Sequence, residues 1–311
     1  MVKHLAVALA ASELLPLIDR VGRVLLGKER QVRLAFSCLV AGGHLLIEDR
    51  PGMGKSTLAE ALARVFSLEF KRVSFTSDLL PADLTGLNVF NPGEASFRFQ
   101  PGPLFTQVLL ADEINRASPR TQSALLEAMA AGRVSVDGIS HGLPRPFFVI
   151  ATQNSLDQVG TSPLPEAQLD RFLMRLSLGF PDRSAERALL QGDFNSSATI
   201  ASVASVLDGD NLQRLQQRCA AQHCSELLLD YVLDLMEASR LRQGGLSPRA
   251  SQGLVAAAKA WSLLEGRDHV VIDDVQAVFA AVVEHRLDAG CPVGQGSPLS
   301  AALLETVPAL R

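Results

Sequence analysis

The chain has 311 residues, of which 47% are hydrophobic and 20% are charged, and its formal net charge is −4 at pH 7. This composition excludes a disordered protein and allows a sizeable core, in one domain or, more usually at this length, in two. The basic residues are mostly dispersed arginines that form no Lys/Arg run, so generic nucleic-acid binding gets no support, although a local basic pore stays open.

Targeting and redox features point to the cytoplasm. No stretch approaches the ~20 apolar residues needed to span a bilayer. Residues 1–20 superficially resemble a signal peptide, but Ser12 and Glu13 interrupt the apolar run, so a first helix packed on the core is preferred. The cysteines lack the pair spacing of a metal site, and idle thiols in a reducing cytosol are favoured over a Cys219–His223 metal pair.

A strand, a glycine-bearing turn and a helix form the most informative stretch. Amphipathic helices are predicted over 13–25 and 29–39, and a short buried strand follows over 45–47. The next helix is predicted from Lys55. Between strand and helix, the turn Pro51–Ser56 places glycines where backbone N–H groups can surround a phosphate. Lys55 would reach the β- and γ-phosphates, and the Ser56 hydroxyl would bind Mg²⁺. We expect the break at 26–28 to lie near the base of the nucleotide.

One position departs from the phosphate-loop pattern G-x-x-x-x-G-K-[ST]. Asp49 stands where the first glycine is usual. Aspartate tolerates left-handed backbone angles better than most residues, so the turn can survive. A carboxylate beside a triphosphate is nevertheless unfavourable unless it points away.

A strand over 70–75 and then a hairpin are predicted next. Segments 86–90 and 96–100 flank the turn Asn91-Pro92-Gly93-Glu94, which is typical of a hairpin. Such an insertion is longer than a connection requires. Structural decoration and a working appendage are both open interpretations.

The stretch 107–113 reads as a buried strand that ends in two carboxylates. Asp112 could bind the waters of Mg²⁺, and Glu113 could orient and deprotonate an attacking water. Strand ends often carry acids, but this pair lies about one crossover after the GKS turn. Together the two motifs indicate the core of a nucleoside triphosphate hydrolase.

Two further polar candidates follow later elements. Ser118 is predicted to cap a helix, a second hairpin is predicted over 132–147, and a buried strand over 147–151 leads to Asn154. Asn154 could hold the lytic water or contact the γ-phosphate, or be an ordinary turn residue. A short helix over 165–172 precedes a strand over 173–178. Arg171 beside that helix could stabilise charge on a phosphoryl group bound by a neighbouring subunit, or form a surface salt bridge.

The sequence becomes purely helical after Phe180. We expect a nucleotide-binding core over 1–180, with hairpin inserts at about 84–103 and 132–146, and a helical domain over 181–311. Residues 195–210 read as a loop with a weak helix, 226–242 as an amphipathic helix, and 273–286 as a helix opened by a cap-like Asp-x-x-Gln. Arg249 follows Ser247-Pro248 in a first helical turn, where a cation opposes the helix dipole. Its partner is an external anion: a nearby carboxylate or, in our preferred interpretation, a γ-phosphate.

The motifs GMGKS, LLADE, IATQN, LDRF and LSPRA, in this order, resemble those of the AAA+ ATPases, and the stretch ADEINRASPRTQSALLEAM to LDRF is similar to the MoxR branch. The resemblance implies a three-layer αβα P-loop core with a parallel sheet, an all-α C-terminal lid, and a ring, commonly a hexamer. It also implies chaperone-like remodelling or maturation of partners that carry von Willebrand factor A-type domains. The two hairpins match inserts that typically line the pore of the ring.

The resemblance assigns a role to each candidate residue. Glu113 is the catalytic base, Asn154 the first sensor, Arg171 the arginine finger donated across a subunit interface, and Arg249 the second sensor. The resemblance assigns Mg²⁺ binding to Ser56 and Asp112. Nucleotide binding falls to the loop residues Arg50, Pro51, Gly52, Met53, Gly54, Lys55, Ser56 and Thr57.

We therefore expect a Mg²⁺-dependent ATP hydrolase that works as a ring. Two alternatives remain open. One is a nucleotide-gated binding switch with little hydrolysis. The other is a DNA-dependent motor or a metal-chelatase subunit of the same clade. The acidic charge balance argues mildly against the DNA-dependent motor.

Overall fold

The computed structural model describes residues 11–154, 161–191, 207–241, 245–288 and 298–309. Its centre is a parallel sheet of five strands in the order β2-β5-β8-β1-β9. The strands are β1 (Leu45–Glu48), β2 (Phe70–Ser74), β5 (Val108–Asp112), β8 (Phe148–Gln153) and β9 (Met174–Leu176). Most are continuous apolar runs, as expected for a parallel sheet covered on both faces.

Alternate residues of the strands enter two separate cores, which makes the fold three-layered. Leu45 and Ile47 join one core with the helices α1 (Ala11–Val24), α2 (Glu29–Val40) and α3 (Lys55–Val65). Leu46 joins the other core with α4 (Pro81–Thr85) and α5 (Pro119–Ala131). Successive side chains of a strand point to opposite faces, so this division follows from the sequence.

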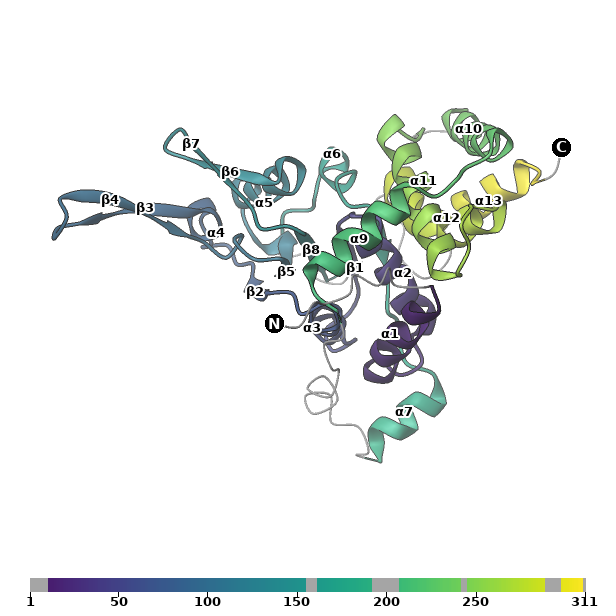
Figure 1. Ribbon diagram of the computed structural model, residues 1–311, viewed down its shortest axis with the longest axis horizontal. Coiled ribbons are helices and arrows are strands. Elements are labelled where there is room, and N and C mark those ends of the chain that lie inside the picture. The colour runs from purple at the N-terminus through teal and green to yellow at the C-terminus, as the bar shows by residue number, and fades with distance from the viewer. Residues whose placement is uncertain (1–10, 155–160, 192–206, 242–244, 289–297, 310–311) are drawn as a thin grey trace, which may run out of the picture.

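Both hairpins expected from the sequence are present. The first pairs β3 (Gly86–Asn91) with β4 (Ser96–Pro101), and the second pairs β6 (Arg133–Val136) with β7 (Ile139–Gly142). Figure 1 shows the β3–β4 hairpin projecting far from the body, with the β6–β7 hairpin on the same side. The projection leaves Phe90 and Phe97 51% and 71% exposed.

The described residues after β9 are helical. They form α7 (Arg183–Leu190), α9 (Gly209–Ala220), α10 (Glu226–Arg240), α11 (Pro248–Leu264), α12 (Ile272–Leu287) and α13 (Pro298–Thr306); the short α6 (Glu166–Leu169) and the 3₁₀ turn η1 (Ile114–Arg116) lie earlier in the chain. α11 packs on α12 and α2, and α12 also contacts β9. Most of the loop predicted over 195–210 lies outside the described residues. No helix in the described part is long and apolar enough to cross a membrane.

The cap predicted for the last long helix is wrong. The helix begins at Ile272, one residue before Asp273, and Asp274 acts instead: its Oδ2 accepts a hydrogen bond from the Val271 N–H at 2.9 Å. Val271 is extended, so the chain enters the helix earlier than the Asp-x-x-Gln pattern suggested. Arg267 also pairs with the buried Asp274 carboxylate, which is why aspartate is placed inside the first turn.

Candidate functional site

The glycine-bearing turn follows β1 and ends at the start of α3. Gly52 and Gly54 have φ angles of 82° and 88°, in the left-handed region where a side chain would strain the backbone. A Cβ at Gly52 would meet no atom within 4 Å, so backbone conformation rather than space requires this glycine. The amide groups of the first turn of α3 thus open toward the loop, as in an anion-binding helix N-terminus.

Lys55 lies inside this turn and is tied to two strand ends. Its Nζ donates to the Asp49 carbonyl at 2.7 Å and lies 3.4 Å from the Gln153 carbonyl. Burial lowers the pKa of Lys55, and the carboxylates of Asp49, Asp112 and Glu113 oppose that change. Lys55 is therefore within electrostatic reach of both acids that end β5.

Thr152 of β8 fixes the two acids relative to each other. Its Oγ1 donates to Asp112 Oδ1 at 2.6 Å and accepts from the Glu113 N–H at 2.9 Å. Thr152 is fully buried, and Glu113 has a φ of 56°, which is uncommon for a residue with a side chain. A strained residue held by a buried hydrogen bond is typical of a functional position.

Arginines that sequence reasoning missed accompany both acids. Arg72 of β2 contacts Asp112 Oδ2 at 2.5 Å, and Arg116 contacts Glu113 Oε2 at 2.8 Å. Register could have found Arg72, because β2 and β5 are adjacent strands. On the neighbouring strands β9 and β1, the buried Arg175 pairs with Glu48 at 3.2 Å. Burial raises the pKa of the Glu48 carboxyl, and Arg175 opposes that change.

The carboxyl ends of β1, β5 and β8 thus gather most of the predicted residues at one edge. Asn154 directly follows β8, which lies between β1 and β5 in the sheet. The donor set there, a serine hydroxyl and a strand-end carboxylate, suits Mg²⁺, which keeps waters and takes few protein ligands. Within the described part of the chain, no three His, Cys, Asp or Glu side chains cluster as a metal site of their own.

A cavity of about 170 Å³ adjoins the loop. Leu26 and Lys28 line it together with Gly52, Gly54 and Thr57. The break at 26–28 was expected near the base of a nucleotide, and it does lie beside the phosphate loop. Lys28 is 7% exposed and donates to the Phe180 carbonyl at 2.5 Å, so its charge is held at the cavity wall.

Arg171 and Arg249 lie elsewhere. Arg171 Nη1 donates to the Leu126 carbonyl at 2.6 Å. Arg249 is 62% exposed, and its Nη1 lies 3.7 Å from Asp170 Oδ2, so the carboxylate left open as its partner is Asp170. Residues 170–173 precede β9, and the Leu173 N–H donates to the carbonyl of His44, which precedes β1. Both arginines therefore stand at the amino edge of the sheet, opposite Lys55.

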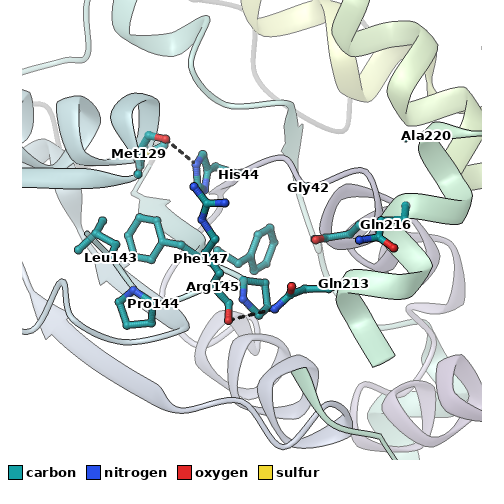
Figure 2. Close-up of a pocket in the computed structure, with 14 residues that line it drawn as sticks. Gly42, His44, Met129, Leu143, Pro144, Arg145, Phe147, Gln213, Gln216 and Ala220 are labelled. Carbon is teal, nitrogen blue, oxygen red and sulfur yellow. Dashed lines mark hydrogen bonds between the residues drawn. The ribbon is translucent and has the colours of Figure 1, made fainter. Parts of the chain in front are cut away.

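A second, larger hollow of about 480 Å³ lies at this amino edge (Figure 2). His44 and Arg145 face it from the core, and Gln213 and Gln216 face it from α9. The hollow has neither a phosphate loop nor paired acids, so it does not compete with the carboxyl edge as a nucleotide site. Burial lowers the pKa of His44 to about 4, which keeps the imidazole neutral at physiological pH.

A glycine-rich loop after one strand, and paired acids after another strand of the same parallel sheet, define the class of P-loop nucleotide hydrolases. Residues 44–174 match the ATPase family associated with various cellular activities (AAA), and residues 236–305 match the AAA lid domain.

Relatives of known name are similar over most of their length. The chain is 41% identical to the uncharacterized protein YeaC of Bacillus subtilis, over 87% of this chain and 85% of that protein. It is 38% identical to chaperone MoxR1 of Mycobacterium tuberculosis (87% and 74%) and 35% identical to protein MoxR of Paracoccus denitrificans (85% and 85%). A crystal structure of a candidate ATPase from Cytophaga hutchinsonii superposes with a TM-score of 0.83 at 31% identity, covering 96% of this chain and 95% of that one. The chain belongs to the MoxR family of AAA+ ATPases, and its activity class is accordingly ATP hydrolysis.

Proposed function

We propose that this chain assembles into a ring, commonly of six copies, whose Mg²⁺-dependent ATP hydrolysis remodels or matures partner proteins. One observation supports assembly into a ring: the phosphate loop and the two candidate arginines lie at opposite edges of the same sheet. The strands between them have three to six residues, so the edges are about 10–20 Å apart. An arginine at the amino edge can meet a nucleotide only if a neighbouring copy supplies that nucleotide.

The residues of the carboxyl edge support in-line attack of water on the γ-phosphate. The loop amides and Lys55 hold the β- and γ-phosphates, and Glu113 orients the water and takes its proton. Asn154 holds the same water or the γ-phosphate. Ser56 and Asp112 would bind Mg²⁺, which when present neutralises charge that develops on the phosphate oxygens.

The amino edge of the next copy would complete the site. Arg171 stabilises charge on the transferring phosphoryl group, and Arg249 reaches the γ-phosphate from the same neighbour. The position of Asp170 supports a shared location for the two arginines: it follows α6, directly before Arg171 in the chain, and its carboxylate faces the first turn of α11, which carries Arg249. On this arrangement Arg249 acts in trans.

The β3–β4 hairpin is the candidate element for gripping a partner. Phe90 and Phe97 form an exposed edge-to-face pair with ring centroids 5.3 Å apart. Apolar side chains exposed on a projecting element usually mark an interaction site. Partners with von Willebrand factor A-type domains are our proposal from the family resemblance. One of the relatives reported above is named as a chaperone, which supports the remodelling of partner proteins but does not bear on which partners they are.

The alternative is a nucleotide-gated switch that binds but barely hydrolyses. This alternative rests on Asp49, because a carboxylate that points at the triphosphate would weaken nucleotide binding. The Asp49 carboxylate faces residues 177–179 instead, which favours the hydrolase.

Steady-state ATP hydrolysis, measured over a series of protein concentrations, tests the proposal. Specific activity should rise with concentration, since the site is completed between copies, and chelation of Mg²⁺ should abolish it. The blank is Glu113→Gln, which should bind ATP but hydrolyse it about 10²–10⁴-fold more slowly. Wild-type turnover by that variant would refute the base assignment. Activity no higher than the blank, with nucleotide bound, would favour the switch.

A further inference from the structure

Asp49 is the residue in the phosphate loop that the proposed chemistry does not use. It is 8% exposed, and Oδ2 of its carboxylate faces residues 177–179, outside the loop. Oδ2 accepts hydrogen bonds from the Leu178 N–H at 2.6 Å, the Gly179 N–H at 2.8 Å and the Ser177 hydroxyl at 3.1 Å. Oδ1 accepts from the Arg50 N–H at 3.0 Å. Four hydrogen-bond donors thus satisfy this buried carboxylate and fix its position.

The backbone of Asp49 is tied to the catalytic edge. Its carbonyl accepts from Lys55 Nζ at 2.7 Å, and its N–H donates to the Gln153 carbonyl at 3.2 Å, one residue before Asn154. One residue thus joins the phosphate loop, the end of β8 and the segment after β9. Glycine at this position could make the backbone contacts but none of the four side-chain contacts.

The segment that Asp49 holds forms a wall of the cavity beside the loop. Gly179 and Pro181 line this cavity together with Gly52 and Gly54. Between them, the Phe180 carbonyl accepts from Lys28, and the Arg50 guanidinium lies over the Phe180 ring, 5.6 Å from its centroid. Displacing residues 177–179 would open this wall while leaving the glycines of the loop in place.

We propose that Asp49 is a positioning residue for nucleotide binding, whose carboxylate fixes residues 177–179 as the wall on the nucleoside side of the phosphate loop. This inference rests on the proposed nucleotide site. It assigns Asp49 to affinity for the base and ribose, and not to affinity for the phosphates or to the chemical step.

Two ligands separate these roles: a non-hydrolysable ATP analogue and inorganic tripolyphosphate, each titrated with Mg²⁺ into the full chain. Asp49→Gly should weaken binding of the analogue about tenfold and leave tripolyphosphate within about twofold. Asp49→Asn keeps the shape but loses the charge, so we expect about threefold weaker analogue binding. In steady-state kinetics the variants should raise KM and keep kcat, the signature of lost uniform binding.

Ser177→Ala removes one donor to the same carboxylate and should act in the same direction, more weakly. It also carries the test if Asp49→Gly does not fold, which thermal unfolding without nucleotide would reveal. Glu60→Gln on α3 is the matched control: among the described residues the partner of Glu60 is Arg64, in an exposed pair, so this variant should bind both ligands like wild type.

Three results would overturn or redirect the inference. Equal losses for the analogue and tripolyphosphate would place Asp49 in phosphate binding, and unchanged binding of both would show that the wall holds without it. A fall in kcat at constant KM would make Asp49 part of the chemical step. Failure of the wild type to bind the analogue would instead refute the proposed function itself.

Discussion

Asp170 and Arg249 face each other where the sheet meets the C-terminal helices, with Arg249 Nη1 3.7 Å from Asp170 Oδ2. The same carboxylate accepts from the buried Nε of Arg286 at 2.7 Å. Arg286 also donates to the Phe172 carbonyl at 2.7 Å, so α12 is bonded to the chain directly before β9. Asp170 therefore holds Arg249 and joins it to α12, and it lies directly before Arg171 in the chain.

Asp170→Asn should lower kcat about tenfold without changing affinity for ATP. The amide loses the charge that orients Arg249, whereas the copy's own phosphate loop lies at the other edge of the sheet. Analogue titration and steady-state kinetics measure the two quantities. The control is Asp230→Asn on the exposed side of α10, which should behave like wild type. A change in affinity with constant kcat would contradict the assignment.

Mixing two inactive variants tests whether Arg171 acts on a neighbour. Lys55→Ala should lose nucleotide binding but still donate Arg171. Arg171→Ala should bind ATP but hydrolyse it at least about 10²-fold more slowly. Mixed rings contain some sites with an intact loop and an intact neighbouring arginine, so hydrolysis should recover on mixing. Each variant incubated with more of itself is the control. Mixtures that remain inactive, while still assembling, would place Arg171 outside the site.

Replacing Phe90 and Phe97 by serine should separate hydrolysis from partner binding. Both rings are exposed on the projecting hairpin, so basal hydrolysis should stay within about twofold of wild type. Binding of a permanently unfolded, carboxymethylated polypeptide, measured by fluorescence anisotropy, should fall at least about tenfold. Leu227→Ser removes a 75% exposed apolar side chain from α10 and should change neither quantity. Undiminished binding by the double variant would remove the hairpin from the partner site.

Acid should destabilise the fold through His44. Its Nδ1 accepts from the Val149 N–H at 3.1 Å and its Nε2 lies 3.4 Å from the Met129 carbonyl, the contact drawn in Figure 2, so the half-buried ring is neutral. Burial lowers its pKa from 6.5 to about 4. Between these values the unfolded chain binds the proton and the folded chain does not, so stability falls as the pH drops from 6.5 to 4. The loss attributable to His44 is on the order of 2 kcal/mol.

Urea unfolding at pH 8 and pH 5 measures this loss. In His44→Gln the difference between the two pH values should shrink by about that amount. Part of the difference should remain, because burial also keeps the pKa of His285 well below its usual value. An equal pH dependence in variant and wild type would mean that His44 titrates normally.

The fold was predictable because most strands of the central sheet are apolar runs with a marked end. The loop, the acids at 112–113 and both hairpins follow from residue types at fixed spacing. The side-chain contacts that could not be predicted join residues far apart in the chain, and they depend on how the strands are aligned. No residue near Asp49 in the chain predicts its contact with Ser177, and no residue near Asp112 predicts its contact with Arg72. Thr152 joins two acids forty residues away, and the left-handed backbone of Glu113 has no local signal. The first residue of α12 was misjudged because Asp274, not Asp273, supplies the cap.

β9 has only three residues, yet it connects two contacts described above. At its carboxyl end, residues 177–179 are held by Asp49 beside the cavity that adjoins the phosphate loop. At its amino end stand Asp170 and Arg171, which in the proposed ring face the nucleotide of the next copy. A strand about 10 Å long therefore joins the residues beside a subunit's own phosphate loop to the residues that the subunit would present to its neighbour. In the proposed ring, this connection would let the occupancy of one nucleotide site affect hydrolysis at the next.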